Sequence, residues 1–404
     1  MQWANALSTR ASLEAAVKET VERLKDRFER PPDLGLVFIS SAFTSEFSRL
    51  LPLLQDLLPL PVLVGCSGSG VIGMDPNGTP REIESAPALS LTLASLPGVS
   101  VRSFHLSSDD LPDLDSPPDA WVELVGVTPE DNPQFILMAD PFSSSINDLL
   151  QGLDFAYPNA VKVGGLASVD GFNRQSGLFC DRTCHREGVV GVALSGPVVL
   201  EAIVAQGCRP IGPAYQVTQA ERNILLTLSD PTADPVERPP LEVLQDLIQT
   251  LSEDDRKLAQ NSLFIGIAQD SFKLTLNQGD FLIRTLLGVD PKAGAIAVGD
   301  RVRPGQRIQF HLRDAQTSAE DLDTLLRDYW QSLTGTAPAG ALMFSCTGRG
   351  EGLYQEANFD SGLFHHYLSS VPLSGFFCGG EIGPVGKTTF LHGYTSVFGL
   401  CRRP

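Results

Sequence analysis

The sequence lacks a long apolar run, because no stretch of its 404 residues reaches the ~18 apolar residues of a membrane-spanning helix. Positive charge is also scarce: 30 Lys and Arg face 48 Asp and Glu, which gives a net charge of −18. That balance opposes binding to nucleic acid and to anionic membranes, since both need a basic face. The first residues do not join a basic region to an apolar one, so no secretory signal is expected.

Regularly spaced cysteines are missing too. The seven cysteines form an odd, irregular set, which predicts reduced thiols and a cytoplasmic protein. Cys180 and Cys184 precede His185 with a spacing one residue longer than that of the haem-attachment motif C-x-x-C-H. We expect a surface turn there and no metal site.

Complete catalytic and nucleotide-binding motifs are absent as well. Neither H-E-x-x-H nor G-x-S-x-G occurs. The run Gly68–Gly73 satisfies G-x-G-x-x-G, but a turn follows it where a dinucleotide site needs a helix. The run Gly383–Thr388 resembles the end of a phosphate loop, yet Glu381 stands where that loop needs a glycine. We therefore expect neither a dinucleotide nor a nucleoside triphosphate.

What the sequence does have is glycine at high local density. The stretch Gly375–Gly386 carries five glycines and one acid, Glu381, after an apolar run. Two weaker echoes occur upstream, at Gly65–Gly73 and Gly164–Gly171. Glycine at this density indicates tight turns or a close approach of the backbone to a ligand or another strand.

The first two glycine turns belong to a longer repeated pattern. A shift of 99 residues places Leu36 on Phe135 and Gly65 on Gly164, with strand, helix, strand and turn in register. This spacing predicts an internal repeat over 34–110 and 133–206, with a looser third copy around 341–386. Residues 89–96 and 99–106 alternate as two strands that would pair with each other.

The expected fold class is α/β (α+β): a duplicated, layered sandwich of mixed β-sheets covered by helices, in two domains. A helix is predicted within 1–33, an N-terminal domain over 34–227 and a C-terminal domain over 241–404. The proline-rich, acidic stretch 228–240 is the expected linker, because helices avoid the residue before proline and strands avoid proline itself.

The strongest polar cluster lies in the C-terminal part. Cys346, Arg349, Glu381 and His392 fall at strand ends or in glycine loops, and the glycines beside them are Gly348, Gly379 and Gly380. An arginine could hold a ligand carboxylate and a glutamate its amine, so these residues form the candidate ligand site. The alternative reading is an internal Arg–Glu ion pair that closes the domain.

Long C-terminal motifs also resemble the FIST family. They are Phe281–Asp290, Gly299–Gly305, Phe344–Gly350, Gly375–Pro384 and Leu391–Thr395, joined by weaker N-terminal turns at Val64–Ser67 and Val163–Gly165. The resemblance implies a sensory protein that binds a small ligand, with an amino acid as one candidate. In the family the signal passes to attached output domains, whereas here we expect a stand-alone module with a separate signalling protein partner.

The resemblance and the residues leave three alternatives. A bacterial branch of the family implies a haem-binding nitric-oxide sensor, although no cofactor is expected from the residues themselves. Eukaryotic relatives with an F-box imply a protein–protein interaction scaffold. The residues also allow an enzyme with Cys346 as nucleophile and Glu381 or His392 as base, although we expect no enzyme.

Overall fold

The chain in this computed structural model forms two compact units, one of residues 1–205 with 323–404 and the other of residues 206–322. The structure describes residues 1–404 except 144, 170–174, 231–235, 272 and 334. The predicted α/β class with two compact units is confirmed. The division differs from the predicted boundary, because the described part of 228–240 lies inside the second unit. Residues 231–235 of that linker, and 170 and 171 of the second glycine turn, lie outside the described residues.

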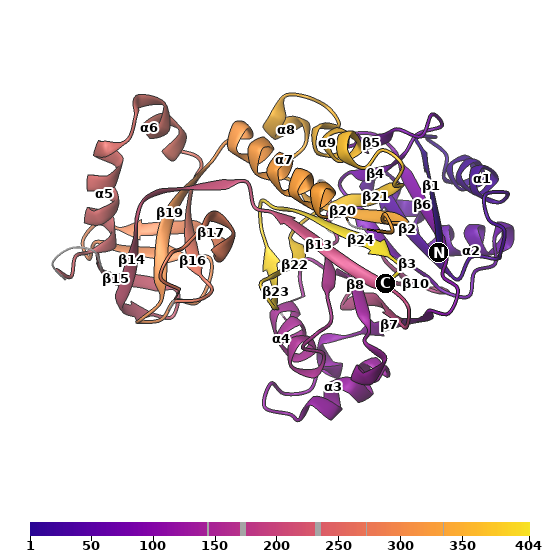
Figure 1. Cartoon of the computed structure of the whole chain (residues 1–404), viewed down its shortest axis with the longest axis horizontal. Coiled ribbons are helices and arrows are strands. Elements are labelled where there is room, and N and C mark those ends of the chain that lie inside the picture. Colours follow the sequence, from indigo (N-terminus) through magenta and orange to yellow (C-terminus); the bar gives the residue numbers. More distant parts are fainter. Residues whose placement is uncertain (144, 170–174, 231–235, 272, 334) are drawn as a thin grey trace. The chain divides into compact units, whose positions relative to one another are not determined.

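The first unit contains three sheets with one strand order (Figure 1). The chain of this unit consists of three modules, residues 2–95, residues 100–195, and residues 199–205 with 323–402. Each sheet begins with the first strand of one module, followed by the last strand of that module and then by its parallel pair. In sheet order the strands are β1 (Gln2–Ser8), β6 (Leu89–Ser95), β2 (Leu34–Ser40) and β3 (Leu63–Gly68); β7 (Ser100–Leu106), β12 (Val189–Ser195), β8 (Gln134–Ala139) and β9 (Lys162–Leu166); and β13 (Val199–Ala205), β24 (Ser396–Arg402), β20 (Gly340–Cys346) and β21 (Leu373–Cys378).

A hairpin from another module completes each sheet. The hairpin β4 (Val71–Met74) and β5 (Pro80–Ile83) of the first module joins β21 of the third. The hairpin β10 (Leu178–Cys180) and β11 (Thr183–His185) of the second module joins β3 of the first. The hairpin β22 (Glu381–Val385) and β23 (Thr388–His392) of the third module joins β9 of the second. The exchange is therefore cyclic.

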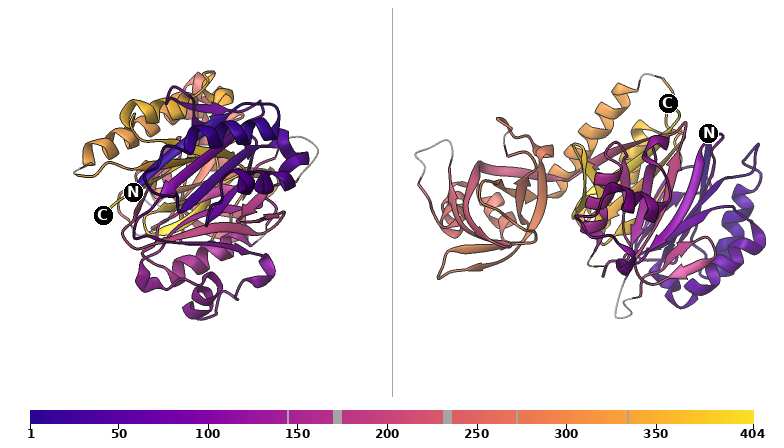
Figure 2. Two further views of the ribbon diagram at one scale, coloured as in Figure 1. Left: turned by 90° about the vertical axis from the view of Figure 1, so that its right-hand side faces the viewer. Right: turned by 90° about the horizontal axis from the view of Figure 1, so that it is seen from below.

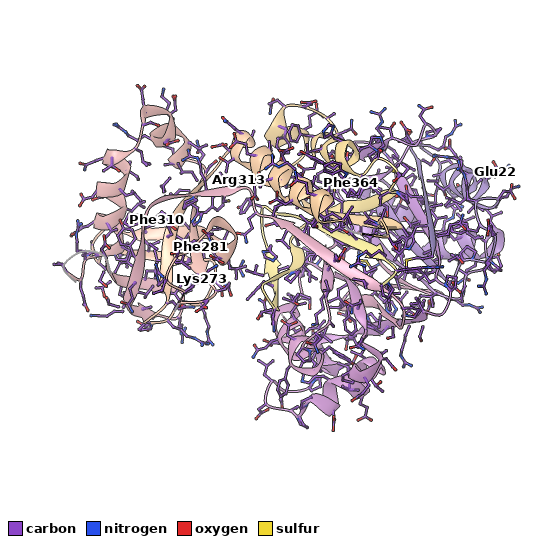
Figure 3. The ribbon with its side chains drawn as sticks, in the orientation of Figure 1. Glu22, Lys273, Phe281, Phe310, Arg313 and Phe364 are labelled. Atoms are coloured by element: carbon purple, nitrogen blue, oxygen red, sulfur yellow. The ribbon has the colours of Figure 1, made fainter. Side chains whose placement is uncertain are left out.

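The three sheets share one core and carry their helices outside (Figure 2). Leu36, Ile136 and Leu342, one from each sheet, belong to the same buried apolar cluster. The covering helices are α1 (Leu13–Leu24), α2 (Phe47–Leu57), α3 (Pro118–Val125), α4 (Ile146–Ala156), α7 (Ala315–Ser332), α8 (Glu351–Tyr354) and α9 (Phe359–Tyr367). The ring of Phe364 on α9, labelled in Figure 3, stacks on Phe398 of β24 with centroids 5.5 Å apart.

Strand register corrects the repeat that the sequence predicted. Val37 pairs with Gly65, and Leu137 pairs with Gly164, so the first strands of the parallel pairs are offset by 100 residues and the second strands by 99. The helices that follow, α2 and α4, begin at Phe47 and Ile146, again 99 residues apart, so the one-residue difference falls between the first strand and the helix. A one-residue slip turns each side chain of a strand to the other face, so Leu36 corresponds to Ile136 and not to Phe135.

One strand was missed, and one further expectation was wrong. The helix expected within 1–33 is α1, but strand β1 precedes it, because Ala6 and Leu7 bury their side chains when β1 pairs with β6. Strands β6 and β7 do not pair with each other: β6 lies between β1 and β2, and β7 pairs with β12. Both pairings join segments distant in sequence, which alternation of apolar residues does not reveal.

The second unit is a closed barrel with its own core. In barrel order its strands are β14 (Cys208–Glu221), β15 (Ile224–Ser229), β18 (Ala295–Val298), β17 (Phe281–Asp290), β16 (Leu263–Ala268) and β19 (Arg307–Arg313), and its helices are α5 (Pro240–Thr250) and α6 (Glu253–Ala259). Phe281 and Phe310, labelled in Figure 3, are fully buried. The barrel follows β13 and ends within α7, so it interrupts the third module where the first has the short link between β1 and α1.

Candidate functional site

The three glycine turns that follow the parallel strands contact one another. Main-chain hydrogen bonds run from Leu166 N–H to the Gly380 carbonyl at 2.7 Å and from Phe377 N–H to the Gly70 carbonyl at 3.0 Å. The hydroxyl of Ser168 donates to the Phe377 carbonyl and accepts the N–H of Ser69 at 2.7 Å. One turn from each module thus meets the other two, and we call this place the glycine corner: 67–70, 166–168 and 377–380.

Glycine allows the close strand approach beneath the corner. A Cβ atom on Gly65, Gly164 or Gly375 would lie 1.8 Å from a carbonyl oxygen of the parallel neighbour strand. No side chain fits at that distance, so the three positions require glycine for packing. These glycines contact strands and explain part of the glycine density that the sequence shows.

Glu381 differs chemically from its counterparts in the other modules. It begins β22 and pairs with Gly165, as Val71 pairs with Phe376 and Leu178 pairs with Cys66. The first module therefore has valine at this place, the second has leucine and the third has a carboxylate. Burying a carboxylate is unfavourable unless hydrogen bonds compensate it, so packing alone does not account for Glu381.

Glu381 is completely buried, and its Oε2 accepts the N–H of Thr395 at 3.0 Å. Glu381 also interacts electrostatically with the thiol of Cys378. Burial raises the pKa of Cys378 well above its ordinary value, and the Glu381 carboxylate, Cys66 and Cys346 add to this effect in that order. Glu381, Cys346 and Cys378 consequently form one polar group beneath the glycine corner.

Cys346 ends β20 at the edge of this group. Its side chain is 9% exposed, and the main chain of Gly348 donates a hydrogen bond to its sulfur at 3.4 Å. Gly348 and Gly379 are both exposed, whereas Gly380 is buried against Leu391 and Leu166. The predicted Cys346, Gly348, Gly379, Gly380 and Glu381 therefore lie at or beside one corner.

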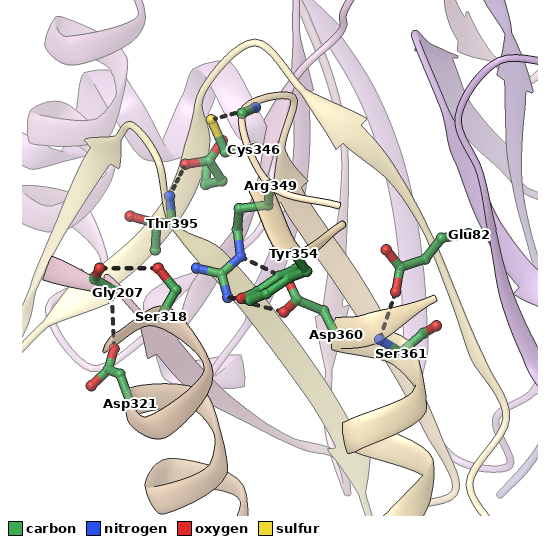
Figure 4. Close-up of polar contacts among 12 residues, drawn as sticks. Glu82, Gly207, Ser318, Asp321, Cys346, Arg349, Tyr354, Asp360, Ser361 and Thr395 are labelled. Atoms are coloured by element: carbon green, nitrogen blue, oxygen red, sulfur yellow. Dashed lines mark hydrogen bonds and ion pairs between the residues drawn. The ribbon is translucent and has the colours of Figure 1, made fainter. Parts of the chain in front are cut away.

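Arg349 binds a residue that the sequence did not single out. Its Nε and one terminal nitrogen donate to the two carboxylate oxygens of Asp360 at 2.7 and 3.0 Å, and both side chains are fully buried (Figure 4). The same terminal nitrogen contacts the Tyr354 hydroxyl at 2.5 Å. The ion pair predicted as Arg–Glu is thus Arg349–Asp360, a two-pronged pair that fixes α9 to the loop after β20.

Two more residues of the first module that the sequence did not single out contact α9 and the start of α8. Glu82 on β5 accepts the N–H of Ser361 in the first turn of α9 at 2.7 Å (Figure 4), and Glu84 accepts the N–H of Glu351 at 2.8 Å. Burial first, then Asp360 and Glu84, raise the pKa of Glu82 to about 7. The acidic run 82–84 after the first glycine turn was the available sequence signal, but its partner is 279 residues away.

His392 lies beside Glu381 in the β22–β23 ladder and is buried. Its Nε2 lies 3.0 Å from the Gly383 carbonyl oxygen, so in this arrangement Nε2 carries the proton and donates. The predicted histidine is therefore next to the corner, with its ring held by the strand that also carries Glu381.

The packing of the histidines bears on the haem alternative. His311 is fully buried against Phe281, and the rings of His105 and His185 stack on each other with centroids 3.6 Å apart. Within the described part of the chain no group of three or more His, Cys, Asp or Glu side chains could hold a metal ion. An axial ligand needs an open face beside its ring, which the packing of His311 does not provide, whereas His366 is exposed.

The cavities among the described residues include four that lie away from the predicted site. One, of about 430 Å³, lies in the barrel unit between α5 and the strand ends, near Tyr215, Arg238 and Asp246. The others have volumes of about 300, 270 and 190 Å³ and lie in the first unit. None of the four is lined by the predicted site residues.

No helix among the described residues is long and apolar enough to cross a membrane.

Comparison with known proteins gives the family. An uncharacterized protein of Mycobacterium tuberculosis is 33% identical over 369 residues, which cover 91% of each chain. A protein of Mycobacterium bovis, also uncharacterized, is 33% identical over 387 residues, 96% of this chain and 95% of the other. A cyanuric acid hydrolase structure from A. caulinodans aligns over 99% of both chains, with 10% identity and a TM-score of 0.34. The FIST N domain model matches residues 33–230 and the FIST C domain model residues 240–384. The chain belongs to the FIST family, whose domains indicate sensing and ligand binding.

Proposed function

We propose that this protein is a sensory module that binds a small ligand at the glycine corner. The observation that carries the proposal is Glu381, a fully buried carboxylate where the other two modules have Val71 and Leu178. A charge retained at a position that packs well as an apolar residue is typical of a functional site.

The chemistry of the corner favours a ligand with an amine. Glu381 supplies negative charge, and Gly348 and Gly379 beside it are exposed. Arg349 is buried and forms a two-pronged ion pair with Asp360, so the proposal does not assign it to a ligand carboxylate. Amines, with amino acids among them, are the proposed class, and a separate protein partner would receive the signal.

Binding without catalysis fits the surroundings of the thiols better than an enzyme does. Burial raises the pKa of Cys378, so this residue is not an activated nucleophile. His392 directs Nε2 to the Gly383 carbonyl, where Nε2 donates a hydrogen bond and is not available as a general base.

The test is a thermal-shift and calorimetry panel of amino acids and simple amines against the full chain. A ligand at one hundred times its Kd stabilises the unit that binds it by ~2.7 kcal/mol, a shift of several degrees. Glu381→Gln should abolish the shift, whereas Glu82→Gln, which removes another buried carboxylate, should keep it. A panel without any shift, or a shift that survives Glu381→Gln, would refute the proposal.

A further inference from the structure

Cys346 and Cys378 face each other on neighbouring strands. They are the last residue pair in the register of parallel strands β20 and β21, and all seven cysteines of the chain are thiols in this structure. Neighbouring strands lie ~4.8 Å apart, within the ~4.4–6.8 Å between Cα atoms that disulfides span. Residues paired in this way direct their side chains to the same face of the sheet.

The pair is specific to the third module. At the same place the first module has Ser40 beside Gly68, and the register of β8 and β9 continues to Asp140 beside Ala167. Strand packing therefore does not require sulfur here. Both cysteines also end their strands, where the backbone has more freedom to adopt disulfide geometry than in mid-sheet.

From this geometry we infer that Cys346 and Cys378 are a redox pair that hydrogen peroxide converts to an interstrand disulfide. This inference concerns the same corner as the proposed function but does not depend on a ligand. The disulfide would tie β20 to β21 directly below Gly348 and Gly379, so oxidation would change the corner that the proposed ligand occupies.

The two sulfurs differ in exposure, which assigns their order of reaction. Cys346 is 9% exposed and receives the Gly348 N–H, a contact that favours its thiolate, whereas Cys378 is fully buried. The Cys346 sulfur attacks the peroxide O–O bond and becomes a sulfenic acid, with release of one water. The Cys378 sulfur then attacks the Cys346 sulfur and forms the S–S bond, and the hydroxyl group leaves as a second water. Two thiols lose two electrons and two protons, and the peroxide is reduced to water.

The chain contains a matched pair that should not react in this way. Cys180 and Cys184 are more exposed, but Cys180 pairs with Thr183 and Cys184 with Phe179 across the β10–β11 hairpin. Neighbouring cross-strand pairs point to opposite faces, and the two thiols accordingly pack against different apolar clusters. Exposure alone predicts oxidation at Cys180 and Cys184, whereas geometry predicts a bond between Cys346 and Cys378.

The experiment treats the full chain with hydrogen peroxide, blocks remaining thiols under denaturing conditions and maps tryptic peptides without reduction. Cys346 lies in peptide 328–349 and Cys378 in peptide 350–387, so the disulfide joins these two peptides with a loss of two hydrogens. Cys346→Ser should remove the link, and Cys401→Ser, a buried thiol elsewhere in the unit, should keep it. In Cys378→Ser the Cys346 sulfenic acid should accumulate and react with dimedone.

Three results would overturn the inference: a link of peptide 350–387 to peptide 50–81 through Cys66, oxidation of Cys346 beyond the sulfenic acid without a link in the wild type, or no oxidation in excess peroxide. Because the peptides are read without a ligand, failure here would leave the amine panel unaffected, and failure of that panel would leave the disulfide unaffected.

Discussion

His311 makes the stability of the barrel unit depend on pH. Its imidazole is fully buried against Phe281, with ring centroids 5.0 Å apart, and a Cβ on Gly266 would lie 2.5 Å from its Cε1. Burial lowers the pKa of His311 from 6.5 to about 4, although the hydrogen bond to the Gln309 carbonyl acts in the opposite direction. The folded barrel therefore holds this side chain neutral.

The sign and size follow from proton linkage. A histidine whose pKa is depressed in the folded state contributes its full stability above the ordinary pKa of 6.5 and loses it as the pH falls toward 4. At ~1.4 kcal/mol per pKa unit, a shift of about 2.5 units corresponds to ~3 kcal/mol, of which ~2 kcal/mol is already lost at pH 5. That is a large share of the stability of a domain this size.

Hydrogen exchange with mass spectrometry is the suitable assay, because Trp3, Trp121 and Trp330 all lie in the first unit and do not report on the barrel. Between pH 7 and 5, exchange in β16 and β19 should report a loss of ~2 kcal/mol that His311→Leu removes. The matched control is His366→Gln, an exposed histidine in the first unit. Equal pH dependence in the wild type and His311→Leu would refute the reasoning.

Three further predictions concern the first unit, and its tryptophan fluorescence in urea can measure each of them. Glu82→Gln should flatten the pH dependence between about 4.5 and 7, because a carboxyl whose pKa is raised to about 7 loses its stabilising effect as the pH rises through that window; an unchanged slope would contradict this. Asp360→Asn should cost about 3–5 kcal/mol, since it leaves the buried Arg349 guanidinium without its counter-charge; a loss below ~1 kcal/mol would argue against a tight pair. Gly164→Ala should prevent folding because its Cβ would lie 1.8 Å from a β8 carbonyl oxygen, whereas Gly362→Ala in α9, with open space around its Cβ, should be neutral or stabilising; a folded, stable Gly164→Ala protein would be the contrary result.

Local elements were predictable because periodicity reports which face of a segment is buried. The first strand and the helix of the predicted repeat are β2 and α2 in the first module. The glycine turns were also predictable from the sequence, because only glycine allows the close strand contacts at Gly65 and Gly375.

Pairing between distant segments was not predictable from one sequence. A uniform shift of 99 residues hid the offset of 100 residues between β2 and β8, and the exchange of hairpins between modules leaves no local pattern. The partner of Arg349 was missed because Asp360 becomes its neighbour only when α9 packs against the loop. Glycine in the sequence indicated the close strand contacts, but no comparable pattern indicated the ion pair between Arg349 and Asp360.

The cyclic exchange of hairpins has a consequence for biosynthesis. The edge of β9 stays unpaired until β22 and β23 are synthesised, and the hairpin β4–β5 stays unpaired until β21 is synthesised. Strand β9 and the hairpin β4–β5 both leave the ribosome long before these partners. Unpaired edges of this kind invite association with other chains. Nascent chains arrested before residue 373 should therefore recruit chaperones or aggregate, and the unit should close only when translation has almost finished.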